Sequence, residues 1–456
     1  MNQVSFPVMK TYETDVLVIG GGPAGFPAAV CAARNGVKVM LCEKESCLGG
    51  MATTSLVGPF MPCYDPAGEK QVIRGFFDEF VTRLEKNGGA IHPSKIEGDT
   101  GHASYRNEGH AHVTPFDCEA YKLLADEMIQ ENGVQLLYNV TFQGCAVTDD
   151  GAIDYAIFSG KGGFFTVKAK EYIDCTGDAD VAFSAGAPCA HGDREGDDVQ
   201  PVSIFFMLDG IDKAPLQKWM EEHTEDKDIR HFGDKVRYER EKGTYTVPRH
   251  NVEFYEELDG SWRVNMAQVN NVDSANPEQT TEALIRLRKQ IPEIIWFLKK
   301  YVPGCENARL RVSSSVLGVR ESRHIVGEFV LKGEDLAQST RFEDAIFLSG
   351  NVIDIHQNMA VYYPTTHATE AYEVPYRVLL PQKVSNLLVA GRCISADRKA
   401  VGAIRVMPPC FAMGQAAGTA AAMCVKNGTT PATVDVPALQ QLLRDADVTV
   451  RKEEIR

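Results

Sequence analysis

Near the N-terminus, a short apolar run leads into a glycine-rich turn, and a second apolar run follows one helix length later. Residues 16–19, Val-Leu-Val-Ile, have the length of a buried strand and precede residues 20–25, Gly-Gly-Gly-Pro-Ala-Gly. An alanine-rich segment continues to about Arg34 and predicts a helix, which an Asn-Gly pair ends. Residues 37–41 predict a second strand, with Glu43 at its end. This order of strand, glycine turn, helix, strand and acid is typical of a unit that binds a dinucleotide.

Each small residue of the turn has a physical task. Gly20 permits the tight turn, Gly22 lets a pyrophosphate approach the backbone, and Gly25 lets helix and strand pack closely. The N-terminus of the helix presents free N–H groups and a partial positive charge to that pyrophosphate. Glu43 can accept hydrogen bonds from ribose hydroxyls. The turn therefore predicts a site for FAD or NAD.

Two features favour FAD. The motif begins near residue 15, which leaves no room before it for a substrate domain. A second glycine-rich turn, residues 47–54 (Cys-Leu-Gly-Gly-Met-Ala-Thr-Thr), follows Lys44. Such an open backbone suits close approach of the flavin half of FAD.

With these motifs the sequence resembles the two-domain FAD-dependent oxidoreductases, and more narrowly the group related to fumarate reductase and thiazole-biosynthesis flavoproteins. Four later segments extend the resemblance to about residue 445: residues 169–180, 315–330, 386–395 and 414–422. The resemblance implies an α/β fold with a discontinuous Rossmann-like FAD-binding domain and an inserted α+β substrate or cap domain. We expect residues 1–190 and 376–456 in the first domain and residues 191–375 in the second.

The resemblance also implies which residues contact FAD. They are Gly20, Gly22, Pro23, Ala24, Gly25, Glu43, Lys44, Gly49, Gly50, Met51, Ala52, Thr53, Val140, Thr176, Gly177, Asp178, Gly391, Arg392, Gln415 and Ala416. In relatives, the helix that contains Gln415 and Ala416 points its N-terminal end at the flavin, and Met407 to Cys410 would form the wall beside the ring.

Hydrophobic periodicity predicts further elements. Helices are expected at 72–86, 117–132 (with Asp117 as N-cap), 217–241 and 278–301. Strands are expected at 133–138, 152–159, 164–170, 200–207 and 261–269, the second and third as a hairpin. In the inserted domain these elements suggest an antiparallel sheet with helices on one side.

Three arginines are candidate catalytic residues. Arg405 lies just before the C-terminal helix and could reach a substrate carboxylate or enolate, or else pair with an acid at the domain interface. Arg320 and Arg323 are three residues apart and would share one face of a helix. One of the two could face the active site while the other pairs with Glu321 or Glu328.

Two histidines are candidates for general acid–base work, the alternative for each being a hydrogen-bonded interface residue. On a strand, Asp354 would lie on the same face as His356 and could orient its imidazole. His367 follows Tyr-Tyr-Pro-Thr-Thr in a loop that closes on the flavin in relatives. The sequence departs from the common family pattern between residues 358 and 373.

Composition limits the possibilities. A chain of 456 residues should form two or three domains, and its net charge of −15 argues against nucleic acid and anionic membrane partners. No apolar run reaches membrane-span length, and the N-terminus lacks the order of a signal peptide. Twelve cysteines without C-x-x-C spacing suit reduced thiols in the cytoplasm. The pair His110 and His112 lies in a polar loop and favours solvated side chains over a metal site, so no metal is expected.

No second glycine fingerprint for NAD(P)H is visible, so a separate electron donor or acceptor, or a freely binding nicotinamide, is expected. The sequence therefore predicts an enzyme that moves a hydride between flavin N5 and a small polar or anionic substrate, by dehydrogenation or C=C reduction. The alternatives are an oxidase or monooxygenase that uses dioxygen and a flavin protein serving structure or electron transfer. A homo-oligomer is compatible with the sequence.

Overall fold

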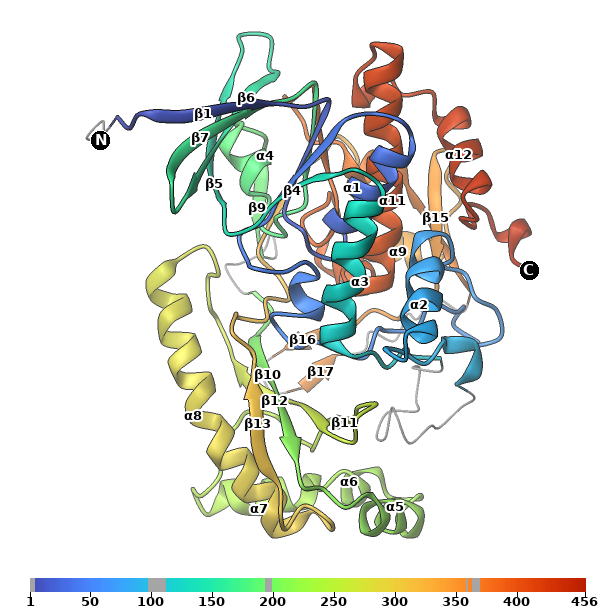
Figure 1. The fold of residues 1–456 in the computed structure, drawn as a ribbon. Helices are drawn as coiled ribbons and strands as arrows, with labels where there is room; N and C mark the ends of the chain where they lie inside the picture. The colour runs from blue at the N-terminus through green and yellow to red at the C-terminus, as the bar shows by residue number, and fades with distance from the viewer. Residues whose placement is uncertain (1–4, 97–111, 193–198, 358–359, 363–369) are drawn as a thin grey trace.

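The centre of the molecule is a five-stranded parallel sheet with the strand order β19-β8-β2-β3-β4. The computed structural model describes residues 5–96, 112–192, 199–357, 360–362 and 370–456. The strands of this sheet are β2 (Val16–Ile19), β3 (Val39–Cys42), β4 (Gln135–Leu137), β8 (Glu171–Asp174) and β19 (Leu387–Val389). Strands from both ends of the chain therefore meet in one sheet, and the expected discontinuous Rossmann-like α/β fold is confirmed (Figure 1).

The two faces of this sheet pack against different layers. Val16 and Val18 belong to a core shared with helices, whereas Leu17 and Ile19 belong to a core shared with a second sheet. The helices are α1 (Gly25–Arg34), α2 (Phe76–Lys86), α3 (Cys118–Glu131), α11 (Met407–Asn427) and α12 (Val436–Asp445). The second sheet has the order β1-β7-β6-β5, formed by β1 (Val8–Glu13), β5 (Thr141–Val147), β6 (Ile153–Gly160) and β7 (Gly163–Lys168). The alternation along β2 explains why this strand is apolar on both sides.

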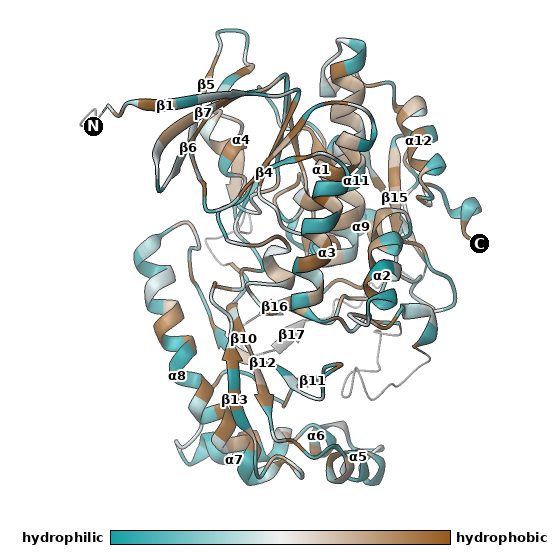
Figure 2. Cartoon of the chain, in the orientation of Figure 1, coloured by the Kyte–Doolittle hydropathy of each residue, from teal (hydrophilic) through white to brown (hydrophobic). Residues whose placement is uncertain are grey.

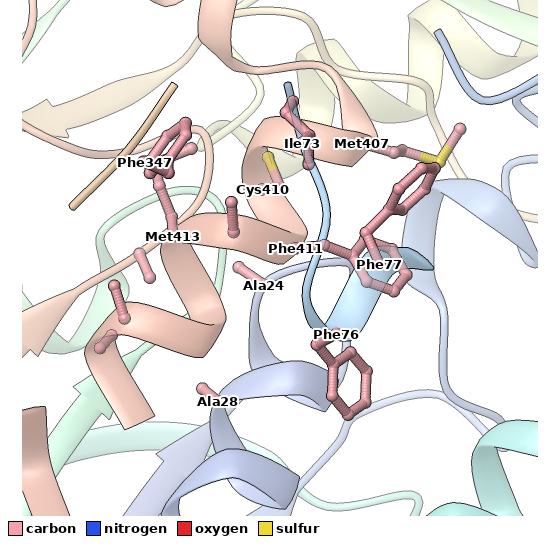
Figure 3. Close-up of a cluster of buried hydrophobic side chains, with 14 of the residues drawn as sticks. Ala24, Ala28, Ile73, Phe76, Phe77, Phe347, Met407, Cys410, Phe411 and Met413 are labelled. Atoms are coloured by element: carbon pink, nitrogen blue, oxygen red, sulfur yellow. The ribbon is translucent and has the colours of Figure 1, made fainter. Parts of the chain in front are cut away.

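Close packing of α11 on α1 depends on glycine. A Cβ atom at Gly414 would lie 2.0 Å from the carbonyl oxygen of Ala24, and one at Gly418 would lie 2.1 Å from that of Ala28. Figure 3 shows Ala24 and Ala28 beside the first turns of α11, with Phe411 close to Phe77. The small residues of 414–422 therefore allow contact between two helices, whereas the sequence had suggested contact with the cofactor.

The inserted region contains a four-stranded antiparallel sheet with the order β11-β12-β10-β13. Its strands are β10 (Val202–Asp209), β11 (Phe254–Glu256), β12 (Trp262–Val269) and β13 (Arg309–Ser313). Helix α8 (Pro277–Tyr301) packs on one face, and α5 (Lys213–Glu222), α6 (Lys227–Arg230) and α7 (Gly233–Glu241) lie at the far end (Figure 1). Brown and teal alternate along α8, which has one face on the sheet (Figure 2).

The segment that returns from the inserted region packs in the first core. Strands β15 (Ala345–Ser349) and β18 (Tyr372–Pro375) pair antiparallel and share a core with α11. The remaining elements are α4 (Asp180–Ser184), β9 (Cys189–His191), β14 (Arg323–Ile325), α9 (Gly333–Ala337), β16 (Ile355–Gln357), β17 (Ala360–Tyr362), α10 (Arg398–Ile404) and five 3₁₀ turns, η1 (Gly50–Ala52), η2 (Pro93–Lys95), η3 (Tyr376–Leu379), η4 (Pro431–Thr433) and η5 (Lys452–Glu454).

We propose that the inserted domain ends near residue 330 and not at 375.

Local signals explain where several elements begin and end. Asp117 caps α3 by accepting a hydrogen bond from the backbone N–H of Ala120 at 2.7 Å, as expected. Helix α2 begins at Phe76 and not at Val72, because Gly75 has φ +60° and interrupts the helical backbone. The expected helix 217–241 is wrong as one element, because three helices occupy this segment. Phe232, which has φ +61° and a buried ring, separates α6 from α7.

No helix in the described ranges combines the length and apolar character needed to cross a membrane. All twelve cysteines are free thiols.

Candidate cofactor and substrate site

A cavity of about 440 Å³ is lined by both the parallel sheet and the inserted region. All five parallel strands end at it. The lining residues that follow the strands are Gly20 after β2, Glu43 after β3, Val140 after β4, Cys175 after β8 and Ala390 after β19. The carboxyl ends of the strands in an open parallel sheet are where such folds bind ligands. The cavity is therefore the candidate functional site.

The glycine turn at the end of β2 leaves open space at the edge of the cavity. Gly20 has φ +95°, and a Cβ there would lie 2.5 Å from the carbonyl oxygen of Cys175. A Cβ at Gly25 would lie 1.7 Å from the carbonyl oxygen of Gly20, so the helix must start with a glycine. Gly22 has no heavy atom within 4 Å of its Cβ position and borders the cavity. The open space at Gly22, beside the N-terminus of α1, fits a pyrophosphate.

Glu43 stands at the end of β3 with its carboxylate fixed by backbone groups. Its Oε2 accepts from the N–H of Gly21, and its Oε1 accepts from the N–H of Glu45 at 2.8 Å. Burial raises the pKa of Glu43, and these two hydrogen bonds oppose that shift. Glu43 and Lys44 both line the cavity. The fixed carboxylate lies where a ribose would be expected.

The second glycine-rich turn divides into lining and supporting residues. Gly50 and Met51 line the cavity. Gly49 (φ +103°) is not among the lining residues, and neither is Ala52. Thr53 also lies outside the lining and donates from Oγ1 to the carbonyl of Leu48 at 2.8 Å. These residues shape the turn that presents Gly50 and Met51.

An ion pair joins the turn after β8 to the turn after β19. Oδ1 of Asp178 lies 2.8 Å from Nη2 of Arg392, and Ser322 donates to the same Asp178 oxygen. Burial opposes ionisation of Asp178, but Arg392 and Ser322 outweigh it and lower its pKa. Thr176, Gly177 and Gly391 line the cavity next to this pair. The pair therefore fixes two backbone turns at the edge of the site.

The structure brings three of the five catalytic candidates to the cavity: Arg405, His356 and Arg320. Arg320 donates to the carbonyl of Pro201 at 2.8 Å and to Ser203 Oγ at 3.1 Å. His367 lies outside the described residues. The metal candidate His110 does so as well, and no group of three or more metal-binding side chains occurs in the ranges that are described.

Arg323 does not line the cavity. It pairs with Asp180 at 2.5 Å and stacks over the ring of Phe183 at 4.3 Å. The expected helix for Arg320 and Arg323 is wrong. Gly318 forms an isolated antiparallel bridge with Ser203, which keeps this segment extended, and Arg323 begins β14. The partner of Arg323 is thus Asp180 and neither Glu321 nor Glu328.

His356 takes part in a buried polar row across the cavity wall. Its Nδ1 lies 3.1 Å from Nη1 of Arg249, and its Nε2 lies 3.2 Å from Oδ1 of Asp354. Oδ2 of Asp354 lies 3.4 Å from Nη2 of Arg405. Because a guanidinium can only donate, Nδ1 accepts and Nε2 carries the proton. Asp354 therefore orients the imidazole, as the sequence suggested.

Burial is the main reason that the pKa of His356 falls to about 3, and Arg320 and Arg249 lower it further while Asp354 opposes them. His356 is consequently neutral at pH 7. Burial also lowers the pKa of Arg405, against the opposing charge of Asp354, but a guanidinium stays ionised at neutral pH.

Gln415 and Ala416 lie away from the cavity. Gln415 Oε1 accepts from the backbone N–H of Phe76 at 2.9 Å and joins α11 to the start of α2. Ala416 is fully buried in the helical core. Only the first turn of α11, through Met407 and Cys410, lines the cavity.

Sequence reasoning missed the inserted sheet as one wall of the site. Ser203, Phe205, Tyr255 and Asn265 line the cavity from β10, β11 and β12. The alternating pattern that predicts strands was visible in the sequence, but nothing in it indicated which face of this sheet meets the FAD motifs. No sequence signal identified Arg249 as the neighbour of His356.

Comparison with known proteins identifies the class. The family described as FAD dependent oxidoreductase matches residues 15–443, nearly the whole chain. The chain belongs to this family, and the protein is an FAD-dependent oxidoreductase whose cofactor is FAD. The open cradle at Gly22 and the fixed carboxylate of Glu43 fit that cofactor.

Curated relatives match a short segment only. Dihydrolipoyl dehydrogenase of Manduca sexta is 49% identical over 47 residues, which is 10% of this chain and 10% of that protein. Soluble pyridine nucleotide transhydrogenase of Chromohalobacter salexigens is 47% identical over 45 residues, again 10% of each chain. The chain thus matches about a tenth of the length of these relatives.

Solved structures match over most of the chain at low identity. p-Nitrophenol 4-monooxygenase PnpA from Pseudomonas putida DLL-E4 is 13% identical with a TM-score of 0.47, covering 97% of this chain and 88% of that one. A geranylgeranyl bacteriochlorophyll reductase-like protein from Thermoplasma acidophilum is 11% identical with a TM-score of 0.40, covering 95% and 83%.

Proposed function

We propose that the protein transfers a hydride between FAD and a small polar or anionic organic substrate, in a dehydrogenation or the reduction of a C=C bond. One observation supports this above all others. A single cavity is lined both by the dinucleotide motif, through Gly22 and Glu43, and by polar groups near the inserted sheet, through Arg320, His356 and Arg405. Cofactor and substrate can therefore share one cavity.

In this proposal, the backbone of Gly22 and the N-terminus of α1 hold the pyrophosphate, and Glu43 holds a ribose. When bound, FAD supplies a hydride donor or acceptor at N5 of its isoalloxazine ring. Met407 and Cys410 at the start of α11 form an apolar wall that excludes water from this end of the cavity.

Arg405 is the residue we assign to the substrate anion. Its guanidinium is buried, its Nη2 is held by the carbonyl oxygen of Asp354 at 3.1 Å, and its Nε has no hydrogen-bond partner in the described part of the chain. A buried donor without a partner is costly and is satisfied when a ligand oxygen arrives. Asp354 keeps the side chain in that orientation.

His356 acts in this proposal as a positioning residue for Asp354. Both of its ring nitrogens are engaged, and its pKa of about 3 leaves it no second proton to give at pH 7. The acid–base role that the sequence suggested for it therefore receives no support from this geometry. A separate donor or acceptor, such as a freely binding nicotinamide, would complete the catalytic cycle.

The test is anaerobic. The purified flavoprotein is photoreduced, and the visible flavin band is followed after adding unsaturated organic acids, enones or dioxygen. Reoxidation by an organic acceptor together with slow reaction toward air is the expected result. Rapid reoxidation by air alone, with no organic acceptor, would overturn the proposal in favour of an oxidase or monooxygenase.

Arg405→Ala separates substrate binding from cofactor binding. We expect the variant to lose about 100-fold in the rate of reoxidation by the best organic acceptor, since one buried charged hydrogen bond is removed. Its flavin content should remain that of the parent protein. Loss of flavin instead would show that Arg405 serves the cofactor or the fold. Arg309→Ala, at an exposed arginine of β13, is the matched control and should change neither quantity.

A further inference from the structure

The transfer of a hydride to a C=C bond also needs a group that supplies a proton. When the hydride bonds to one carbon, the electron pair of the double bond remains for its neighbour, and a proton must bond there. Dehydrogenation needs the same group as a base. His356 does not serve, because its imidazole is neutral and both ring nitrogens are engaged. Arg405 does not serve either, because a guanidinium keeps its protons at neutral pH.

Four ionisable side chains line the cavity from the described residues 199–357: Tyr255, Arg320, Asp354 and His356. Arg320 keeps its charge, as Arg405 does. Asp354 accepts from the Nε2–H of His356 and lies beside Arg405. A carboxylate held by an N–H donor and a cation is favoured in its ionised form and is not a source of protons. Of these four side chains, Tyr255 is the one that can act as an acid.

Other lining groups with a bonded hydrogen are weaker candidates. Ser203, Ser274 and Thr280 line the cavity, but aliphatic hydroxyls are not among the side chains that commonly exchange protons in catalysis. The thiol of Cys410 donates to the carbonyl oxygen of Arg405 at 3.3 Å, and burial raises its pKa to about 12. The other ionisable lining residues belong to β3 or follow β3, β8 and β19, at the edge that carries the dinucleotide motif.

Strand β11 directs Tyr255 toward the cavity. Its neighbour Phe254 belongs to the core that includes α8, so Tyr255 lies on the opposite face of the sheet. Tyr255 pairs with Arg263 of β12, and Asn265, two residues further along on the same face, also lines the cavity. Tyr255 is 8% exposed, and its hydroxyl makes no hydrogen bond within the described part of the chain. An unpaired phenol in a cavity wall is available to a ligand.

Tyr255 also borders the buried polar row that contains His356. The pairing of β11 with β12 extends to Glu253, whose carbonyl accepts from the N–H of Asn265 at 3.0 Å. Residues two apart on a strand share one face, so Glu253 and Tyr255 lie on the same side of the sheet. The carboxylate of Glu253 accepts from Nη2 of Arg249, and Nη1 of Arg249 lies 3.1 Å from Nδ1 of His356. The phenol is therefore close to the groups assigned to the substrate.

From this placement we propose that Tyr255 is the proton donor of the reaction. The inference rests on the proposed function and deepens it. As the hydride bonds to one carbon of the substrate, the O–H bond of Tyr255 breaks. Its proton bonds to the neighbouring carbon through the electron pair of the former double bond, and the phenolate recovers a proton from water. In the reverse direction, the phenolate oxygen takes that proton from the substrate.

Tyr255→Phe removes the hydroxyl and keeps the ring. Parent and variant holoenzymes are photoreduced without air and mixed with saturating fumarate, tiglate or 2-cyclohexenone. With the acceptor that reoxidises the parent fastest, the rate of the variant should fall about 100-fold or more, as expected for the loss of a general acid. Ferricyanide takes electrons without forming a C–H bond, so it should reoxidise both proteins at the same rate. The flavin content of the variant should equal that of the parent.

Tyr245→Phe is the matched control. Tyr245 is another buried tyrosine of the inserted region whose hydroxyl has no hydrogen-bond partner in the described part of the chain, but it does not line the cavity. Its loss should change neither rate. A further measurement needs no variant. In deuterium oxide, the parent should place solvent deuterium on one face of the protonated carbon, because the donor is fixed.

Three results would overturn the role of Tyr255. They are an organic acceptor that reoxidises Tyr255→Phe as fast as the parent, equal slowing of this variant with the organic acceptor and with ferricyanide, and deuterium on both faces of the product of the parent. Each leaves hydride transfer standing. If ferricyanide but no organic acceptor reoxidised the parent, hydride transfer itself would be refuted, and the role of Tyr255 with it.

Discussion

At the scale of single residues, the site depends on glycines, because these residues have no Cβ atom. Gly20, Gly22 and Gly25 occupy one turn, yet their environments differ. Gly20 and Gly25 would collide with backbone if they carried a Cβ, whereas Gly22 faces open space in the cavity. The first two glycines are therefore required by the fold, whereas we propose that the third is required by the ligand.

Gly22→Val should fold but lose FAD, because its side chain would fill the space assigned to the pyrophosphate. Flavin content per protein, measured by absorbance after purification, should fall at least about tenfold. Gly162→Val, at a turn position with nothing within 4 Å of its Cβ, is the control and should retain FAD. A Gly22→Val protein that keeps its full yellow colour would contradict the cofactor assignment.

His356 should make stability depend on pH. Its pKa is about 3 in the folded protein against 6.5 as the ordinary value, so the unfolded chain binds the extra proton first as pH falls. The stabilising contribution is complete above pH 6.5 and is lost progressively toward pH 3. At pH 4.5 the loss amounts to about 2 to 3 kcal/mol, from two pH units at 1.36 kcal/mol each.

His356→Gln cannot take up this proton and should remove that part of the pH dependence. Urea unfolding of both proteins at pH 7.5, 5.5 and 4.5 measures the difference. Parallel losses of stability in the two proteins would show that His356 is not the group responsible.

At the scale of elements, two helices approach each other at glycines. Helices α1 and α11 make the contact at Gly414 and Gly418, where any Cβ would meet the carbonyl oxygen of Ala24, the N-cap of α1, or of Ala28 within α1. The N-terminal ends of both helices border the cavity, so their packing also sets the distance between the pyrophosphate cradle and the wall at Met407. The alanine- and glycine-rich composition of α11 serves this contact.

Gly418→Ala should destabilise the protein although alanine is the better helix former. The added methyl group would lie 2.1 Å from the carbonyl oxygen of Ala28, and overpacking of this kind costs about 1 to 3 kcal/mol. Asn427→Ala, at the exposed end of the same helix, is the matched control. Chemical denaturation measures the free energy of unfolding of the two variants. Equal values would mean that the helices can move apart at little cost in free energy.

At the scale of the whole molecule, a buried arginine of the inserted sheet, paired with a glutamate of the same region, contacts the FAD-binding part. Nε of Arg263 lies 2.8 Å from Oε1 of Glu257, and both side chains are buried. The guanidinium also approaches the carbonyl of Phe116 at 3.4 Å and the sulfur of Cys118 at 3.5 Å. A Cβ at Gly58 would lie 1.5 Å from its Nη1. Arg263 therefore extends from β12 into the first turn of α3.

Glu257→Ala should lower the free energy of unfolding by about 3 to 5 kcal/mol, since it leaves the charge of Arg263 buried without its partner. Glu257→Gln keeps the shape and one acceptor and should lose less. Glu119→Ala, which breaks the exposed pair with Lys122, should cost under about 1 kcal/mol. Thermal unfolding with flavin release as the readout distinguishes them. A small effect of Glu257→Ala would show that the inserted sheet is held by apolar contacts instead.

The sequence predicted those parts of the site whose residues are close to one another along the chain. The turn from Gly20 to Gly25 and the acid at Glu43 are contiguous with the strands that hold them, so spacing alone could predict that Gly20, Gly22 and Glu43 lie together at the end of the sheet, where they line the cavity. Arg320 and Arg323 were assigned to one helix face because they are three residues apart. The bridge between Gly318 and Ser203, which keeps the segment extended, joins residues over 100 positions apart and leaves no local signal. The predicted contact of Gln415 with FAD is not seen at the cavity for a related reason, because the hydrogen-bond partner of Gln415, Phe76, is remote in sequence.

The sequence by itself determined the class of fold, the dinucleotide cradle and the cofactor, because the strand period, the glycine positions and the terminal acid are properties of one short stretch of chain. Only the tertiary structure decided which residues of the inserted sheet line the cavity, the neutral state of His356 and the partner of each arginine. Those depend on burial and on distances between segments such as β10, β16 and α11, which the chain brings together only by folding.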